Sequence, residues 1–498
     1  MLDLCCNLNI QLAQTPIKRL FKDSLVYSAG NVVTRLLPFL LLPVYTHYFS
    51  PEQFGVYSLV RSLWFFAAVF YLFGMETSFQ KFFIEAGEFE ERKKIFSSAL
   101  ILIFITSLIF SLIIFLTSEF DAKLLTGNQD DYYLIRILAL LLIIDPISRF
   151  PMILLNGLQL SRLYTTINII SVIVNFILNL FFIVILKMGI ESILYSFIIY
   201  YAVLFALSFS FCRKYFVFRI YIDKVRSLVN FAFSFLFYGL FLISLDLLDR
   251  FFLGHMKGND EVGIYSACYT IGMVMNLLIS GFRTAWMPFF LNMKDEENNK
   301  IVFSKVFSYF CYGGMAVFLA VSIFAGDIIR IRFGSFAVLD QRYWSGIVIL
   351  PYVLGAYFLF GLYTNLNIAS YFENKIKYLI ISSGIAFVSN IVLNIVLIPP
   401  YSIIGAAAAT LLSYLIMFLV LYYYSQRIYF ISYEWRKIIS LWVFTLLLYF
   451  FNLYLPGFLH INNISVLLIY IVKIASILAL FLVLWRYRVP KINFVKPA

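Results

Sequence analysis

The segment IFSSALILIFITSLIFSLIIFLT, residues 95–117, runs from end to end without a charged side chain. A helix needs roughly twenty mostly apolar residues to cross the hydrocarbon core of a bilayer, which is about 30 Å thick. The segment therefore predicts a membrane-spanning helix. Apolar runs of similar length recur along the rest of the chain and extend this prediction to the whole protein.

The overall composition agrees with a membrane protein. Of 498 residues, 62% are hydrophobic and only 13% are charged, and the mean hydropathy is +0.91. Soluble domains carry about 25% charged residues, so soluble enzymes and secreted, disordered, coiled-coil and nucleic-acid-binding proteins are excluded. The five cysteines show no CxxC spacing, and we expect neither a disulfide framework nor a metal site.

Fourteen apolar segments predict an all-α polytopic fold with about fourteen transmembrane helices. These segments lie near 24–46, 54–75, 95–117, 133–155, 163–186, 190–211, 228–252, 262–290, 301–324, 344–368, 377–398, 403–424, 436–455 and 464–485. The connections between them are short. None has room for a folded extramembrane domain, which needs at least about 50 residues.

The basic residues indicate the orientation of the chain. Of 38 Lys and Arg residues, seven lie within predicted spans, and six lie in loops on one side: Lys123, Lys187, Lys257, Arg330, Arg332 and Arg342. The remaining 25 lie on the side that also holds both termini. Cytoplasmic loops collect Lys and Arg, so both termini are predicted to be cytoplasmic.

Two pairs of similar segments indicate an internal repeat. The sequence EQFGVYS at 52–58 matches DEVGIYS at 260–266, and NFILN at 175–179 matches NIVLN at 390–394. Both offsets carry six predicted helices onto six others. An even number of spans gives the two copies the same orientation, and parallel repeats of this kind are typical of transporters.

Several short motifs follow one another along the chain. They are Ser28-Ala29-Gly30-Asn31, Arg35, Pro43-Val44-Tyr45, Ser50-Pro51-Glu52, Gly55, Tyr57, Asp249–Gly254, Val262–Tyr265, Trp286–Phe289, Asn390, Asn394, Pro399 and Gly405–Ala409. In order and spacing they resemble the polysaccharide-biosynthesis membrane proteins, the O-antigen and capsule flippases of the multidrug/oligosaccharidyl-lipid/polysaccharide exporter superfamily. The resemblance covers roughly residues 20–485.

The resemblance implies two six-helix lobes around a central cavity that opens alternately to each side, followed by two extra C-terminal helices. On this basis the chain divides into a cytoplasmic segment (1–22), an N-lobe (23–222), a C-lobe (223–430) and the last two helices with a cytoplasmic tail (431–498). The resemblance also implies a polyprenyl-diphosphate-linked oligosaccharide as cargo, moved from the cytoplasmic to the outer leaflet.

Charged residues within spans are costly and usually face a cavity or a partner. Arg149 and Arg250 each follow an acid by four residues, Asp145 and Asp246, and this spacing places each pair on one helix face. Such pairs are either structural ion pairs or contacts to an anionic cargo. We consider Asp145, Asp246 and Asp249 as candidates for coupling to a proton or sodium gradient.

Arg35, Arg61 and Arg283 have no acid three or four residues away in their own predicted helices. A guanidinium inside a membrane needs an anion or water, and a diphosphate matches its fork of donors. We therefore expect a cationic cargo cavity, and the alternative for Arg61 and Arg283 is snorkelling to the headgroups. The predicted polar contacts between helices, or with sugars, come from five asparagines: Asn31, Asn175, Asn179, Asn390 and Asn394.

These observations predict a flippase in the inner membrane that serves lipopolysaccharide, O-antigen or capsule synthesis and is not an enzyme. A polysaccharide polymerase or chain-length regulator is an expected partner besides membrane lipids, and nucleic acid is not. The alternatives within the superfamily are a peptidoglycan lipid-precursor flippase and a cation-coupled multidrug exporter. Unpaired arginines outnumber unpaired acids, which favours anionic cargo. A membrane polysaccharide polymerase is disfavoured because no phosphate loop or histidine cluster is present.

Overall fold

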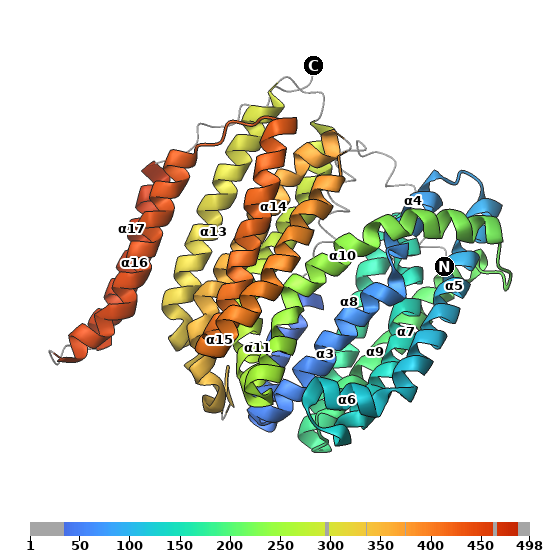
Figure 1. The fold of residues 1–498 in the computed structure, drawn as a ribbon, viewed down its shortest axis with the longest axis horizontal. Helices are drawn as coiled ribbons and strands as arrows, with labels where there is room; N and C mark the ends of the chain where they lie inside the picture. Colours follow the sequence, from blue (N-terminus) through green and yellow to red (C-terminus); the bar gives the residue numbers. More distant parts are fainter. Residues whose placement is uncertain (1–33, 294–297, 335, 374, 462–465, 487–498) are drawn as a thin grey trace, which may run out of the picture. The chain divides into compact units, whose positions relative to one another are not determined.

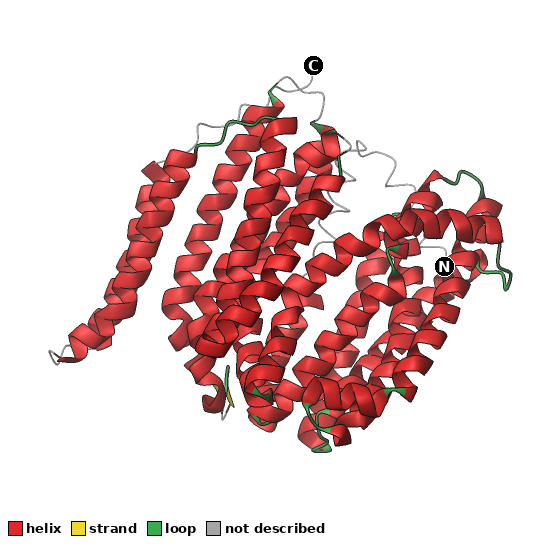
Figure 2. Ribbon diagram, viewed as in Figure 1, coloured by secondary structure: helices red, strands yellow, loops and turns green. Residues whose placement is uncertain are grey.

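Helices make up almost all of the computed structural model, which describes residues 34–293, 298–334, 336–373, 375–461 and 466–486 (Figure 1). Within these ranges the only strands are β1 (Arg332–Phe333) and β2 (Phe336–Ala337), an antiparallel pair (Figure 2). A helix satisfies its backbone N–H and C=O groups internally, as the bilayer core requires. The predicted all-α membrane fold is confirmed.

The helices follow one another with short connections. In chain order they are a helix over residues 34–48, α3 (Pro51–Leu72), α4 (Met75–Glu85), α5 (Phe89–Leu116), α6 (Ser118–Thr126), η2 (Gln129–Asp131), α7 (Tyr132–Gly157), α8 (Ser161–Leu180), η3 (Phe181–Ile185), α9 (Glu191–Cys212), η4 (Arg213–Tyr215), α10 (Ile222–Lys257), α11 (Asn259–Gly272), α12 (Val274–Asn292), α13 (Asn299–Arg330), η5 (Gln341–Ile349), α14 (Leu350–Phe372), α15 (Lys377–Ile428), α16 (Trp435–Ile461) and α17 (Val466–Arg486).

Ten helices of the described residues are long and apolar enough to cross a membrane, or twelve if each of two bent helix pairs is one span. The bent pairs are the two parts of α10 and the pair α11–α12, which bends by 45°. The number of spans is lower than the fourteen predicted for two reasons. The predicted spans 377–398 and 403–424 lie together in α15, and the first predicted span, 24–46, begins outside the described residues.

The long helix α15 is interrupted where the sequence predicts a boundary between two spans. Pro399 and Pro400 lack the N–H groups that would continue the helix, and Ser402 has a non-helical backbone with φ 46°. A Cβ on Gly405 would lie 2.1 Å from the carbonyl oxygen of Leu397. The two halves of α15 therefore meet at a tight bend that only glycine permits.

The chain groups into two compact units by its internal contacts. Unit 1 contains the described residues 34–41, 67–124 and 128–236, and unit 2 contains residues 42–66, 125–127 and the described residues from 237 onward. The boundary at 236/237 lies within α10, further along the chain than the predicted lobe boundary at 222/223. The assignment of two lobes stays a prediction.

Unit 1 is built around α7, which packs against α5 and α9, while α8 packs against α9. Its aromatic core joins Phe79 of α4 to Phe96 of α5 and Phe150 of α7, with ring centroids 6.0 and 5.6 Å from that of Phe79. All three rings are fully buried. Packing of this kind, and not helix propensity, holds the helices of the unit together.

Unit 2 is built around α14, which packs against α12, α13 and α15, and α16 and α17 pack against α13. Trp286, Phe290 and Phe303 form one core cluster with residues of α14 and of the segment after α15. A smaller cluster joins Leu319 and Ile323 of α13 to Leu480 of α17. The last two helices are thus attached to this unit through α13.

The first pair of similar segments, 52–58 and 260–266, lies at the N-terminal ends of α3 and α11, and both segments belong to unit 2. Their glycines face each other. A Cβ on Gly55 would lie 1.8 Å from the carbonyl oxygen of Asn259, and a Cβ on Gly263 would lie 1.9 Å from that of Pro51. Equivalent glycines of the repeat therefore allow the two helix ends to cross in backbone-to-backbone contact.

Candidate functional site

The three arginines that have no acid nearby in their own predicted helices, Arg35, Arg61 and Arg283, differ from one another in their surroundings. Arg61 is half-buried in α3, 5.4 Å above the ring of Phe65, and interacts electrostatically with Tyr45 and Tyr57. Arg283 of α12 is exposed and interacts with Tyr238 and Tyr371. Among the described residues neither guanidinium forms an ion pair.

Arg35 is the third of these residues and the first basic residue within the described part of the chain. It lies on the helix over residues 34–48 and its side chain is exposed. Asn31, predicted as a polar contact near it, lies outside the described residues. Charged residues within a span usually face a cavity or a partner, and the role of Arg35 in cargo binding stays a prediction.

Unit 1 contains a charged triad on α4 and α7. The Arg149 guanidinium donates from Nε to Asp145 Oδ1 at 2.6 Å and from a terminal nitrogen to Oδ2 at 3.1 Å. Glu76 lies 3.6 Å from the other terminal nitrogen. Asp145 is fully buried, and Arg149 keeps 31% of its side chain exposed. Two carboxylates surround one guanidinium, so Arg149 is paired and only partly available to a cargo.

Arg250 on α10 pairs with a different acid from the one that the sequence predicts. Arg250 donates to the backbone oxygen of Asp246 at 2.6 Å, and its ion pair is with Asp249 Oδ1 at 2.9 Å. The predicted Asp246–Arg250 side-chain pair is therefore wrong. Asp249 is fully buried and Arg250 is 6% exposed, and this neighbouring acid neutralises the guanidinium where water does not reach it.

Tyrosines from three helices complete this part of unit 2. Asp246 Oδ1 accepts hydrogen bonds from the hydroxyls of Tyr269, Tyr357 and Tyr414 at 3.1, 2.9 and 3.2 Å. Asp249 Oδ2 accepts from Tyr265 and, at 3.3 Å, from Thr410. We call Arg250 and the seven residues named in these contacts the tyrosine cage. The seven are Asp246, Asp249, Tyr265, Tyr269, Tyr357, Thr410 and Tyr414.

The sequence analysis did not identify the tyrosines and the threonine of this cage. One signal was available, because Tyr265 is part of the repeated motif and corresponds to Tyr57 in the first copy. Its hydroxyl reaches the carboxylate of Asp249 from a neighbouring helix. Tyr357 and Tyr414 lie far from the acids in the sequence and carry no comparable signal.

The two asparagine pairs of the predicted repeat form the same contact, one in α8 and one in α15. Asn179 Nδ2 donates to Asn175 Oδ1 at 3.0 Å in unit 1, and Asn394 Nδ2 donates to Asn390 Oδ1 at 2.9 Å in unit 2. All four side chains are fully buried, and Asn390 Nδ2 donates further to Ser413 at 3.2 Å. Each pair lies within one helix, and the bond from Asn390 to Ser413 joins the two halves of α15. Their burial argues against direct contact with a sugar.

An apolar groove of about 1060 Å³ lies among α13, α14, α15, α16 and α17 of unit 2. Its lining is dominated by side chains such as Phe318, Leu362 and Trp442, and only a few polar groups reach it. Asn452 is 5% exposed, and its Oδ1 has no hydrogen-bond partner among the described residues. Lys473 lines the same groove and pairs with Asp327 at 2.5 Å. We call this cavity the lateral groove.

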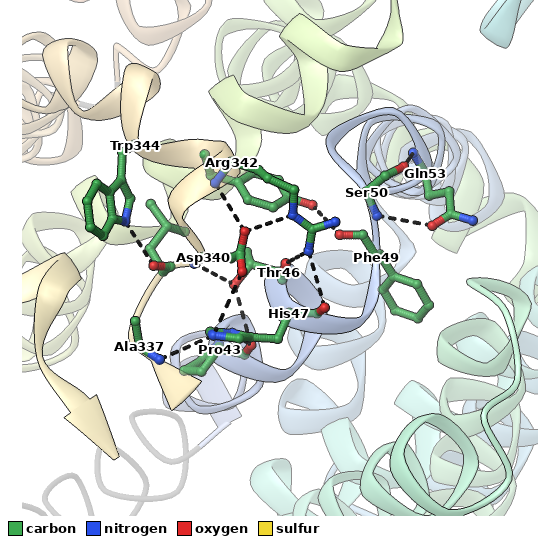
Figure 3. Close-up of polar contacts among 12 residues, drawn as sticks. Pro43, Thr46, His47, Phe49, Ser50, Gln53, Ala337, Asp340, Arg342 and Trp344 are labelled. Carbon is green, nitrogen blue, oxygen red and sulfur yellow. Dashed lines mark hydrogen bonds and ion pairs between the residues drawn. The ribbon is translucent and has the colours of Figure 1, made fainter. Parts of the chain in front are cut away.

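A polar cluster joins the end of the helix over 34–48 to the loop after the β-hairpin (Figure 3). His47 accepts at Nε2 from the backbone N–H of Ala337 at 3.2 Å, and Arg342 donates to the backbone oxygens of Thr46 and His47 at 2.9 and 3.2 Å. Asp340 accepts from Arg342 Nε at 2.8 Å. All these residues belong to unit 2.

The described part of the chain contains no group of three or more His, Cys, Asp or Glu arranged to hold a metal ion. Cys212, Cys268 and Cys311 are buried and free. Cys212 lies in unit 1 and the other two in unit 2, so these thiols serve as buried apolar groups of the packing.

Comparisons with known proteins agree on the kind of molecule. A family model described as "Polysaccharide biosynthesis protein" matches residues 20–294, more than half of the chain. No curated protein matches the sequence significantly.

Solved structures of transporters share the fold. The lipid II flippase MurJ, in an inward closed conformation, is 16% identical, with a TM-score of 0.75 over 93% of this chain and 99% of its own. An inward-facing multidrug resistance MATE family transporter of the MOP superfamily is 12% identical, with a TM-score of 0.66 over 83% and 99%. A MOP superfamily transporter from Pyrococcus furiosus is 14% identical, with a TM-score of 0.61 over 83% and 96%.

Membrane-spanning helices and charged groups inside the membrane are common in transporters. The family match and the shared fold point in the same direction. The chain is a multi-pass membrane protein that belongs to the polysaccharide biosynthesis protein family and has the transporter fold of MurJ and the MATE proteins.

Proposed function

We propose that this protein is a flippase that moves polyprenyl-diphosphate-linked oligosaccharide repeat units from the cytoplasmic to the outer leaflet by alternating access. It would lie in the inner membrane, with both termini in the cytoplasm, and the transported units would serve O-antigen, lipopolysaccharide or capsule synthesis. A polysaccharide polymerase or chain-length regulator would receive the cargo. No bond is made or broken in this reaction.

The lateral groove is the observation that carries the proposal. Within unit 2 it offers about 1060 Å³ of mostly apolar space, and one buried amide oxygen, Asn452 Oδ1, is left without a partner beside it. The helices α16 and α17 that border it have only 22% and 11% of their apolar windows buried in the protein. An apolar space bordered by lipid-facing helices suits a lipid chain, because burial of each CH₂ contributes about 0.8 kcal/mol.

The arginines support an anionic headgroup. Arg35, Arg61 and Arg283 lie in apolar helices, and Arg61 and Arg283 form no ion pair among the described residues. A guanidinium donates two parallel hydrogen bonds to a phosphate or diphosphate, which a lysine does not. Arg149 and Arg250 already have carboxylate partners within their units, and we give them a secondary role in cargo binding.

The coupling ion would act at buried acids. Asp246 and Asp249 lie inside the tyrosine cage, and Asp145 is fully buried beside Arg149. A proton or a sodium ion that neutralises one of these acids would change the balance of charge in its unit. Of the three, Asp246 has no cationic side chain paired with it within the described residues, so it is our first candidate.

Proteins of the same fold are named for two other kinds of cargo, which differ from the proposed cargo in charge or in headgroup. MurJ is named for lipid II, and the MATE neighbours are named for multidrug resistance. A peptidoglycan precursor would use the same groove and arginines, whereas a cationic drug would use the buried acids of the tyrosine cage. The arginines outside ion pairs favour an anionic lipid.

The proposal is tested by deleting the gene and measuring the leaflet distribution of the lipid-linked repeat unit. We expect the unit to accumulate on the cytoplasmic side, and Arg35→Ala or Arg61→Ala to reproduce much of this effect. Arg35→Lys keeps the charge but loses the fork of donors, so it should restore transport only partly.

Arg136→Ala is the matched control for these arginine variants. Arg136 lies near the beginning of α7, where it pairs with Glu119 at 3.7 Å and lies above the ring of Tyr132. Its loss should leave transport unchanged. Normal surface polysaccharide after deletion, in a cell without a substitute flippase, would contradict the proposal.

A further inference from the structure

The connection between α9 and α10 combines exposed basic and exposed apolar side chains. Residues 213–226 contain five basic residues and one acidic residue, Asp223. One of the five, Lys224, pairs with Glu91 of α5. The other four are exposed: Arg213, Lys214, Arg219 and Arg226.

Three apolar side chains in the same segment are exposed at alternating positions. Phe218 is 88% exposed, Ile220 is 40% exposed and Ile222 is 78% exposed. Phe218 lies at a bend, where the N–H of Arg219 donates to the carbonyl oxygen of Val217 at 2.6 Å, and Ile222 is the first residue of α10. All three apolar side chains are thus exposed within five residues of chain, among the basic residues, and we call them the apolar edge. The segment lies wholly within unit 1.

The segment is fixed to unit 1 by its backbone and by one buried ring. Two buried hydroxyls of α5 hold the backbone: Ser97 Oγ accepts from the N–H of Val217 at 2.8 Å, and Ser98 Oγ accepts from that of Tyr221 at 3.0 Å. The ring of Tyr215 lies 4.9 Å from that of Phe89 and is 6% exposed. The protein thus holds the backbone in place and leaves the apolar edge outside.

We propose that residues 213–226 form a membrane-surface anchor that binds the headgroups of anionic phospholipids. The apolar edge enters the boundary between headgroups and acyl chains, and the four exposed basic side chains contact the lipid phosphates. The segment follows directly on α9 and lies against the start of α5, two helices that cross the membrane. The surface of the bilayer begins at this level, so a lipid is the partner that meets the segment.

The charge sets the expected lipid preference. A basic residue near an anionic membrane surface strengthens binding about fivefold, and the effect falls off within a Debye length. Asp223 opposes part of this attraction. The anchor therefore favours phosphatidylglycerol over phosphatidylcholine, mostly through the four exposed basic residues. This inference is independent of the cargo, because none of its residues belongs to the groove or the tyrosine cage.

The test places a fluorophore at the edge of the segment. The full chain with Cys5→Ser, Cys6→Ser and Phe218→Cys is labelled with an environment-sensitive dye, since Cys212, Cys268 and Cys311 are buried. The labelled protein is reconstituted into nanodiscs of phosphatidylcholine with or without phosphatidylglycerol. Lipids with a nitroxide close to the headgroup serve as quenchers.

We expect blue-shifted emission and quenching that grows several-fold when phosphatidylglycerol is present. The variant with Arg213, Lys214, Arg219 and Arg226 all changed to Gln should lose this growth. A matched variant removes four exposed basic residues of unit 2 and should keep it: Lys377→Gln, Arg427→Gln, Arg436→Gln and Lys437→Gln.

Two results would overturn the proposal. One is emission typical of water at position 218 in both lipid mixtures. The other is a dependence on phosphatidylglycerol that survives the four substitutions in the segment. The thermal unfolding of both fourfold variants is first compared with that of the parent. If the variant in the segment unfolds at a lower temperature, the double variant Arg213→Gln/Arg219→Gln replaces it. This double variant should lose about half of the effect of phosphatidylglycerol.

Discussion

Replacing Gly263 by alanine tests the crossing of the two repeat copies in unit 2. A Cβ at this position would lie 1.9 Å from the carbonyl oxygen of Pro51 and 3.0 Å from the backbone nitrogen of Gly55. Ordinary contacts of a Cβ begin at 3.4 Å, so the distance falls short by about 1.5 Å. The obstacle is backbone on both sides, and a change of side-chain rotamer cannot relieve it.

The cost follows from the required separation of the two helix ends. Overpacking that forces a backbone shift costs about 1–3 kcal/mol and occasionally more, and this contact lies at the upper end because no flexible atom can yield. Part of the cost is offset by the better helix propensity of alanine, about 0.5–1 kcal/mol. We expect a net loss of about 1–3 kcal/mol for Gly263→Ala, and the same for Gly55→Ala, where the distance is 1.8 Å.

Thermal unfolding in detergent measures this loss through the buried thiols. A thiol-reactive dye reports when Cys268 of α11 and Cys311 of α13 become exposed, and both are fully buried in the native protein. The apparent Tm of each variant should fall by several degrees. Gly313→Ala is the control, because a Cβ there would meet nothing within 4 Å, and its Tm should stay equal or rise.

The reasoning is refuted if Gly55→Ala and Gly263→Ala both unfold at the temperature of Gly313→Ala. The double variant gives a second criterion. Once one alanine has separated the helices, the second meets less resistance, so the combined loss should be smaller than the sum of the two single losses. A strictly additive result would show that the two glycines do not share one contact.

Three further changes have defined outcomes. Asp249→Asn removes the carboxylate of a buried pair and should lower stability by about 3–5 kcal/mol, and adding Arg250→Gln should recover part of this loss in a double-mutant cycle read by Tm. Burial raises the pKa of Asp340, but the hydrogen bonds and charge of Arg342 lower it more, so the net pKa lies below the ordinary 3.8. The stabilising effect of this carboxylate is therefore complete above about pH 4 and is lost as the pH falls through the lowered pKa, and the Tm difference between the parent and Asp340→Asn, measured against pH, should vanish there; a constant difference would contradict this. Lys473→Met breaks the ion pair between α17 and α13 and should speed proteolytic release of the last helix, whereas an equal digestion rate in parent and variant would show that the pair does not hold α17.

Sequence patterns were sufficient for the features that depend on neighbours along the chain. The apolar run at 95–117 predicts the α5 span because twenty apolar residues suffice by themselves. The repeat at 52–58 and 260–266 identifies two helix starts, and their glycines pack against each other in unit 2. The spacing of Asp145 and Arg149 predicts their contact, since residues four apart share a helix face.

Features that depend on other helices could not be predicted in the same way. The same spacing rule assigns Arg250 to Asp246, but tyrosine hydroxyls from α11, α14 and α15 occupy the Asp246 carboxylate, and Arg250 turns to Asp249. The lateral groove has no sequence signal either, because its apolar lining looks like that of any lipid-facing helix. Tertiary packing, and not the local pattern, decides both.

The most direct test of the flippase proposal is transport in proteoliposomes of the purified protein. A polyprenyl-diphosphate-linked oligosaccharide with a labelled sugar is placed in both leaflets, and a membrane-impermeant glycosidase reports the fraction that reaches the outside. The protein should raise the accessible fraction from about half towards completion, whereas Arg61→Ala should slow this rise and a zwitterionic phospholipid should not be moved. An accessible fraction equal to that of empty liposomes would contradict the proposed function.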